Sequence, residues 1–451
     1  MKKYKLKLIF LSAIAVCCVV GCDYDLAPIK SAAAYPPDLN KESVFRAFSP
    51  DSGGLATQLV LYGENFGTDT SYVKVTVNNK NARVIGVNDT IIYAVVPARA
   101  DTGYVDLYIG KAEAKKKYTS GKEFIYQFKR NVTTVVGQHN QEGRDDGGYA
   151  SSKLRRPWFL LTDKDGAIFF IDEGRGTWSN GALRRAYQGN VETLLQNSEG
   201  PFQSPTCLAF SPRQDTLYIT NYSYPSDAND VKTDFNIIYV TRDGGFMDVR
   251  GLCKGAKVGT QGIAVHPKTG EIFFNNKVDG FIYRYDGPGF NDVTPLFQLN
   301  NGARETEMRL LFNKEGTELY ISVRNRHCIQ KVPYNAATHE FGDAKMLAGE
   351  WDVPGYASGK GPAARFDNPG QPILDEDGNL IVPDKFNHCI RKITPDGDVT
   401  LYAGLPKQWG FGDGLPEQAE FNQPEAITLY TDHTLYVTDR DNHVIRRIAI
   451  E

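Results

Sequence analysis

Cysteine and histidine are scarce in this chain of 451 residues, which holds seven of each. Three cysteines fall within the first 22 residues, and the other four are Cys207, Cys253, Cys328 and Cys389. These four form no Cys-x-x-Cys or Cys/His group, so no zinc site is predicted. We expect all four to be small buried hydrophobic residues rather than disulfide partners.

An excess of basic residues is also absent, since the formal net charge of the whole chain is −3. Removal of residues 1–21, which carry four lysines and no acidic residue, takes this charge to −7. A mildly acidic protein lacks the basic surface that a phosphate backbone requires. We therefore expect no nucleic-acid partner.

Long hydrophobic runs are missing except for residues 8–20, which follow four lysines and are too short for a mature spanning helix. This arrangement predicts a signal peptide over residues 1–21. The next motif, Val19-Val-Gly-Cys22, resembles the lipobox of bacterial lipoproteins, which implies lipidation of Cys22 and a tether over residues 22–43. Asp23 and Asp25 resemble the acidic export signal of surface lipoproteins in the Bacteroidetes, which implies an outer-membrane protein facing the cell exterior. The alternative is an ordinary signal peptide with an accidental cysteine.

Short alternating strands follow the tether, separated by turn residues at the spacing of a small β-sandwich. They are expected at residues 58–62, 72–77, 90–96, 103–109 and 123–128. The turn Tyr62-Gly-Glu-Asn-Phe-Gly67, with the later Val96-Pro97 and Thr102-Gly103, resembles an IPT/TIG immunoglobulin-like domain. The resemblance implies that residues 44–129 are a spacer or interaction module.

A repeat occupies residues 130–451 and is plainest in residues 379–393 and 434–448. In each, a β-branched or aromatic strand ends in Asp, and a turn with Asn-His leads into an alternating apolar and basic strand. His388 and His443 lie 55 residues apart, a period typical of a four-stranded propeller blade. The motif Asn-His-x-Ile-Arg-Lys/Arg-Ile, with its preceding Asp, resembles the NHL repeat.

Six copies of the first two strands of the repeat predict six blades. The first strands are expected at residues 158–161, 207–210, 262–265, 310–312, 372–374 and 426–429. The second strands are expected at 167–171, 217–220, 271–274, 319–322, 380–382 and 435–438. Residues 132–137 resemble 399–404, an outer strand that the last blade lacks, so the N-terminal copy is expected to close the ring. The predicted fold is all-β, a sandwich followed by a six-bladed propeller.

One face of the propeller is expected to carry the candidate ligand site. Antiparallel order places the turn between the second and third strands on the same face as the loop to the next blade. Aromatic residues gather there, and such rings suit the C–H faces of sugars. The candidate glycan-binding residues are Trp158, Trp178, Tyr222, Tyr224, Trp351, Tyr356, Trp409 and Glu425. The alternative is that these rings are buried between blades.

No catalytic residue, metal site or cofactor is assigned. His327, His388 and His443 recur at one blade position, which separates them around the ring and favours a structural role. Asp172, Asp384 and Asp439 end second strands, where an Asp side chain caps a turn. Six-bladed lactonase-type enzymes hold a metal in the channel, and the resemblance places the matching positions at Trp158, Thr206, Gly262, Met308, Gly370 and Glu425. A lone carboxylate, Glu425, is a poor cation site.

Three functions remain open, because propellers support all of them. Bacteroidetes lipoproteins with this domain order resemble accessory proteins of polysaccharide uptake, working beside a TonB-dependent transporter and its lipoprotein lid. This resemblance favours non-catalytic binding of an oligo- or polysaccharide. The first alternative is a scaffold protein whose propeller binds the transporter complex. The second is a hydrolase or lyase with its active site in the channel mouth.

Overall fold

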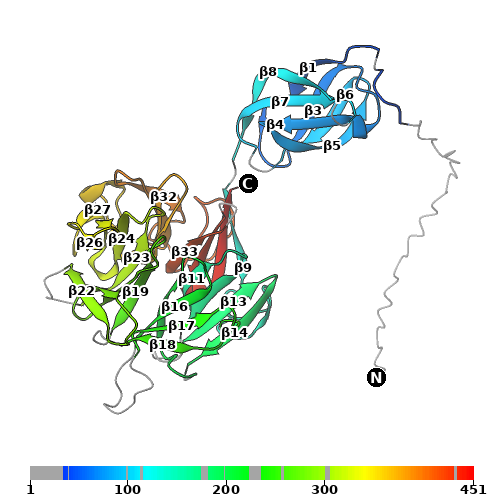
Figure 1. The fold of residues 1–451 in the computed structure, drawn as a ribbon. Helices are drawn as coiled ribbons and strands as arrows, with labels where there is room; N and C mark the ends of the chain where they lie inside the picture. Colours follow the sequence, from blue (N-terminus) through cyan, green and yellow to red (C-terminus); the bar gives the residue numbers. More distant parts are fainter. Residues whose placement is uncertain are drawn as a thin grey trace, which may run out of the picture. The chain divides into compact units, whose positions relative to one another are not determined.

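The computed structural model divides the chain into two units, residues 1–126 and 127–451 (Figure 1). It describes residues 34–450 except 39, 98–99, 112–114, 129, 174–180, 198, 223–234, 255–258, 300–304 and 431–433. Within these ranges no helix has both the length and the apolar character needed to cross a membrane. The predicted signal peptide, Cys22 and most of the predicted tether lie outside the described residues.

The first unit is a β-sandwich. Its strands are β1 (Val44–Ser49), β2 (Ser52–Gly53), β3 (Gln58–Glu64), β4 (Val73–Val77), β5 (Lys80–Asn88), β6 (Ile91–Val95), β7 (Gly103–Ile109) and β8 (Lys116–Tyr126), with a 3₁₀ turn η1 (Thr70–Tyr72). They are hydrogen-bonded in the order β1-β3-β6-β5-β4-β7-β8-β2. Alternate residues such as Leu59 and Leu61 point into one core, as the period of two of a strand requires.

The Asn65-Phe66 turn of this unit holds its incoming segment. Asn65 adopts a left-handed backbone with φ of 58°, a region that asparagine tolerates. Its side-chain amide donates to the carbonyls of Asp38 and Lys41 and accepts from the backbone N–H of Asp38, at 2.7–2.9 Å. Phe66 is fully buried. The motif therefore fixes residues 38–43 against the sandwich.

The second unit is a six-bladed propeller (Figure 1). From the axis outward, the first blade contains β11 (Pro157–Thr162), β12 (Ile168–Asp172), β13 (Ala182–Tyr187), β14 (Asn190–Gln196) and β10 (Gly147–Gly148), and the second contains β15 (Pro205–Phe210), β16 (Thr216–Asn221), β17 (Ile237–Thr241) and β18 (Arg250–Cys253). The third blade contains β19 (Thr260–Val265), β20 (Ile272–Asn276), β21 (Phe281–Tyr285) and β22 (Val293–Gln298), and the fourth contains β23 (Met308–Phe312), β24 (Glu318–Val323), β25 (Cys328–Asn335) and β27 (Lys345–Gly349), with β26 (Glu340–Phe341) beside β25. The fifth blade contains β29 (Ile373–Leu374), β30 (Leu380–Asp384), β31 (Cys389–Ile393), β32 (Asp398–Ala403) and β28 (Gly359–Lys360), and the sixth contains β33 (Pro424–Leu429), β34 (Leu435–Asp439), β35 (Val444–Ile450) and β9 (Arg130–Val136). Short 3₁₀ turns follow some strands: η4 (Arg324–Arg326), η5 (Gly361–Ala363), η6 (Lys385–Asn387) and η7 (Arg440–Asn442).

Each second strand is buried along most of its length because it packs against two neighbouring blades. Every residue of β12, β20 and β30 is buried. Strands covered on both faces are expected to be continuously apolar, and the sequence 168–171 (Ile-Phe-Phe-Ile) follows that rule. The predicted positions of all twelve first and second strands are confirmed. Cys207, Cys253, Cys328 and Cys389 are free and buried, also as predicted.

Strand β9 closes the ring as predicted. It pairs antiparallel with β35, from Ile445 opposite Val136 to Ile450 opposite Arg130. Val132 and Val136 are fully buried. The first strand of the propeller sequence therefore completes the last blade, and residues more than 300 positions apart become partners.

The repeated Asp forms a buried ion pair with an Arg of the third strand. In the last blade, Asp439 Oδ2 accepts from Arg446 and Asn442, each at 2.8 Å, and Asp439 Oδ1 accepts from the backbone N–H of Asn422 at 2.7 Å. Asp384 with Arg391 and Asp172 with Arg184 repeat the pair. The expectation that Asp384 and Asp439 cap their own turns is wrong, because neither makes a side-chain cap there. They hold the loop that enters the inner strand of their own blade instead, since Asp384 Oδ1 accepts from the backbone N–H of Asp367 in the same way.

Candidate functional site

The turns that follow second strands lie on one face of the propeller together with the loops that enter the inner strands. We call this side the loop face and define it by turns 324–327, 385–388 and 440–443 and segments 350–370 and 405–423. Contacts between turns and segments prove the shared side: Asn387 donates to the carbonyl of Gly355, and Asn442 to that of Gly410. The prediction that these elements share one face is confirmed.

The three repeated histidines join adjacent blades. His388 Nδ1 accepts from the backbone N–H of Gln423 at 3.2 Å, and His443 Nδ1 accepts from that of Arg156, also at 3.2 Å. His327 contacts the N–H of Asn368 in the same way. Each histidine has a left-handed backbone, with φ of 56–60°. They lie on separate blades and serve packing rather than a shared catalytic or metal site.

The histidine contacts should depend on pH. Burial lowers the pKa of His388, against the opposing charges of Asp441 and Asp367. The neutral ring therefore stabilises the fold above its ordinary pKa of about 6.5, and this contribution is lost as the pH falls further, because a protonated Nδ1 cannot accept. We expect His388→Ala to cost about 1 kcal/mol at pH 7.5 and clearly less at pH 5. Urea unfolding of both proteins at the two pH values measures this, and a cost independent of pH would contradict it.

A charged cluster occupies the mouth of the channel on the loop face. We define the mouth cluster as Trp158, Arg309, Arg324, Lys385, Glu425 and Arg440, and all six side chains are buried. Lys385 Nζ lies 2.8 Å from Glu425 Oε2, and Arg324 Nη2 contacts Glu425 Oε1. The charged groups of all four basic residues lie 5.0–5.6 Å from the Trp158 ring. Four blades thus bring one carboxylate, four cations and one indole together.

Glu425 is an ion-pair partner rather than a free metal ligand. Burial alone would raise the pKa of Glu425, but the charges of Arg324, Lys385 and Arg309 outweigh it and lower the pKa to about 2. Burial also lowers the pKa of Lys385, and Arg324 and Arg440 act in the same direction. A divalent cation at Glu425 would face three positive side chains. Glu425 is the one carboxylate among the expected mouth positions, and these surroundings make it a poor ligand for a hard cation. The described residues contain no cluster of three or more potential metal-ligating side chains.

Three members of the mouth cluster, Arg324, Lys385 and Arg440, occupy one repeated position that sequence reasoning missed. The residue directly after each second strand is Glu173, Tyr222, Lys277, Arg324, Lys385 and Arg440 in blade order. Four of these six are basic, and the sequence alone contains this signal. Neighbours in the ring are in contact: Arg440 Nη2 lies 2.7 Å from Glu173, and Lys277 Nζ lies 5.0 Å from the Tyr222 ring.

The predicted aromatic platform is only partly accessible. Trp158 and Tyr222 are 5% and 7% exposed, so neither offers a ring face to solvent. Burial occurs because cations of the repeated turn position cover both rings. Trp178 and Tyr224 lie outside the described residues.

The remaining candidate rings lie on the segments of the loop face. Tyr356 is half-buried and stacks on Arg391, 4.3 Å from the ring. Trp351 is half-buried beside Arg326, at 6.0 Å. Trp409 is 73% exposed. Among the candidate aromatic residues that the structure describes, Trp409 is therefore the most exposed.

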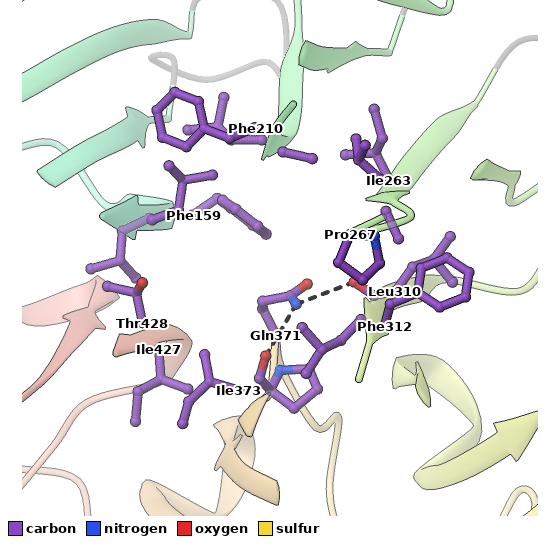
Figure 2. A pocket seen from close by; sticks show the side chains of 18 of the residues that line it. Phe159, Phe210, Ile263, Pro267, Leu310, Phe312, Gln371, Ile373, Ile427 and Thr428 are labelled. Atoms are coloured by element: carbon purple, nitrogen blue, oxygen red, sulfur yellow. Dashed lines mark hydrogen bonds between the residues drawn. The ribbon is translucent and has the colours of Figure 1, made fainter. Parts of the chain in front are cut away.

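The opposite end of the channel holds an apolar pocket of about 290 Å³ (Figure 2). All six inner strands or their extensions line it, with side chains such as Leu161, Phe210 and Ile263. Figure 2 shows Gln371 among them, where its amide donates to the carbonyls of Leu310 and Pro372 at 3.4 and 3.1 Å. The sequence offered no separate signal for this pocket, because its residues read as ordinary core positions.

Comparisons with known proteins agree with both parts of the fold. Residues 43–126 match the family model of the IPT/TIG domain. Two auxiliary nutrient binding proteins have similar structures: one from Bacteroides thetaiotaomicron is 29% identical with a TM-score of 0.64, and one from Bacteroides ovatus is 26% identical with a TM-score of 0.72. Each alignment covers 92% of this chain, and 99% and 100% of the two proteins respectively. A putative phosphatase from B. thetaiotaomicron is 25% identical, with a TM-score of 0.65 over 92% of this chain and 98% of its own.

The propeller also matches a curated relative. NHL repeat-containing protein 2 of Bos taurus is 31% identical over 84 residues, 18% of this chain. The match spans about a tenth of the length of that relative, 11%. The chain therefore consists of an IPT/TIG domain followed by a six-bladed β-propeller of NHL repeats, a fold that it shares with auxiliary nutrient binding proteins of Bacteroides.

Proposed function

We propose that this protein is a non-catalytic accessory of nutrient uptake at the cell surface and that its ligand is a glycan. The observation that carries the proposal is the similarity to two Bacteroides auxiliary nutrient binding proteins along nearly their whole length. Both are described as nutrient binding, and a similar fold over both units supports a similar accessory role. The sugar class is our own addition, based on the aromatic and polar residues of the loop face.

Trp409 is the proposed stacking ring. Its exposed indole lies in segment 405–423, which also carries the exposed polar side chains of Gln408 and Asp413. An indole face packs on the C–H face of a pyranose, while amide and carboxylate groups bond its hydroxyls. Trp351 and Tyr356, half-buried on the neighbouring segment, extend the proposed surface.

We propose further that Cys22 carries the lipid anchor and that the protein faces the cell exterior from the outer membrane. The lipobox-like motif Val19-Val-Gly-Cys22 supports the anchor, and Asp23 and Asp25 support export. The proposed partners in this location are a TonB-dependent transporter and its lipoprotein lid.

Replacing Trp409 by Ala tests the glycan proposal. A glycan array with residues 23–451 identifies a ligand, and titration then measures its affinity for wild type and Trp409→Ala. We expect the affinity to fall about ten-fold or more, on the order of 1–2 kcal/mol, because a stacking ring is lost. The melting temperature should change little, because an exposed ring contributes little to the core.

The control is Tyr93→Ala, which removes an exposed ring of β6 in the IPT/TIG domain. This variant should bind the glycan like wild type. Unchanged affinity in Trp409→Ala would overturn the stacking role. Absence of any glycan ligand would refute the glycan proposal and favour a protein-binding scaffold.

A further inference from the structure

The charges of the mouth cluster do not balance. Glu173 and Asp441 each lie 2.7 Å from Arg440, and Asp441 is also 3.4 Å from Arg156, so two carboxylates match two cations there. The other three cations share Glu425, and among the described residues Glu307 is the one further carboxylate that pairs with them, 3.4 Å from Arg324. Three positive groups therefore face two negative ones, with Glu425 and two of the cations almost completely buried.

Arg309 carries the unmatched charge. Its Nη1 donates to the carbonyl of Met308 at 3.4 Å, and its nearest carboxylate oxygen, Glu425 Oε1, is 3.8 Å from Nη2. Its Nε and Nη2 have no hydrogen-bond partner in the described part of the chain, although the side chain is fully buried. A guanidinium has five N–H donors and binds planar oxyanions with two of them at once. Unused donors of a buried Arg are costly to the free protein and would be satisfied by an added oxyanion.

The surroundings of Arg309 would strengthen such an interaction. The Trp158 ring lies 5.6 Å from its guanidinium and excludes water from one side. Lys385 and Arg440, on the turns of the loop face, are 6% and 9% exposed and lie near the same Trp158 ring as Arg309. Charge–charge attraction grows as water is excluded. An anion that approaches from the loop face therefore meets converging positive groups in a poorly solvated place.

We propose that the mouth cluster binds a singly charged oxyanion of the ligand, so that the ligand is an acidic glycan. This inference rests on the proposed function. The anion is either the carboxylate of a uronic acid or a sulfate ester, since both present the same oxygen geometry to Arg309. Arg309 supplies the hydrogen bonds, Lys385 adds charge, and Glu425 holds Arg324 and Lys385 in place.

The first test compares acidic and neutral monosaccharides with the wild-type chain, residues 23–451. Glucuronate and glucose 6-sulfate are titrated against glucose at equal ionic strength, with calorimetry and melting temperature as readouts. We expect binding and a raised melting temperature with at least one acidic sugar and neither effect with glucose. If only one acidic sugar binds and raises the melting temperature, that sugar identifies the anion. If all three sugars give the same affinity and the same melting temperature, the proposal is overturned.

The second test removes the unmatched cation. Arg309→Met keeps the aliphatic part of the side chain and removes the guanidinium. Binding of the acidic sugar should weaken at least ten-fold. The protein should remain folded, because a surplus buried charge is lost. Lys385→Met is the second variant, with a smaller loss expected. Arg250→Met, which removes an exposed Arg of β18, is the control and should bind like wild type. Unchanged affinity in folded Arg309→Met would overturn the proposal, and if neither cluster variant folds, the sugar comparison with wild type decides it.

The third test exploits the internal carboxylate. Glu425→Gln leaves the neighbouring cations without their shared partner, so the melting temperature of this variant should be lower than that of wild type. The acidic sugar should raise the melting temperature of the variant by more than it raises that of wild type. Equal responses of both proteins would contradict an anion site beside Glu425. The glycan proposal and the acidic-glycan proposal can fail separately. If the array shows binding to neutral glycans alone, the acidic-glycan proposal is wrong and the glycan proposal stands. If the protein binds no glycan of any kind, both are wrong.

Discussion

A propeller that lacks β9 should not fold stably. Truncation at Gln138 removes the strand that pairs with β35 and the buried side chains of Val132 and Val136. Burial of two valines is worth about 1.5–3 kcal/mol each, and the exposed edge of β35 loses its backbone partners as well. The total, about 5 kcal/mol or more, approaches the whole stability of an ordinary domain. We expect the chain 138–451 to aggregate or to melt without cooperativity.

The matched control begins at Gln127, where the second unit starts, and keeps β9. This chain should give one sharp thermal transition by circular dichroism. A synthetic peptide of residues 130–137 should partly restore the transition to the chain 138–451, because the missing strand is then supplied separately. Identical melting curves for the two truncated chains would show that β9 does not close the ring.

Most of the fold could be predicted because its information is local. Strand positions follow from alternation and turn residues, as in residues 379–393, and the period of 55 residues then gives the blades. Even the long-range pairing of β9 was predictable, since residues 132–137 repeat the sequence of an outer strand. The strands β1 and β5 were missed. Each buries one residue, Phe48 in β1 and Ala82 in β5, so neither has the regular alternation of buried and exposed positions that marks a strand.

The mouth cluster was harder to predict because its members come from four blades, and their meeting depends on register. Met308 was one of the positions expected at the mouth, whereas the residue that reaches Glu425 is its neighbour Arg309. A shift of one residue reverses the direction of a strand side chain. Trp158 lies at the mouth as expected, but its burial depends on cations on the turns of three other blades, which the sequence around Trp158 does not contain.

The repeated Asp–Arg pair allows the second large prediction, since Arg446 contacts two carboxylates in very different surroundings. Asp439 is fully buried, 2.8 Å from Arg446 Nη1, whereas Asp413 is 46% exposed, 2.6 Å from Nη2. Removal of one partner from a buried pair leaves an uncompensated charge, which costs about 3–5 kcal/mol. An exposed pair contributes less than about 1 kcal/mol. We expect Asp439→Asn to lower the free energy of unfolding by the larger amount and Asp413→Asn by the smaller.

Burial raises the pKa of Asp439 to about 6, against the opposing charge of Arg446, so urea unfolding should be measured at pH 8, where the carboxylate is ionised. Adding Arg446→Met to Asp439→Asn should recover part of the loss, because the stranded charge disappears with its partner. Equal losses in Asp439→Asn and Asp413→Asn would mean that burial does not set the strength of the pair. A double variant less stable than Asp439→Asn alone would mean that Arg446 stabilises the blade mainly through its bonds to the carbonyls of Gly412 and Glu420, at 2.6 and 2.9 Å.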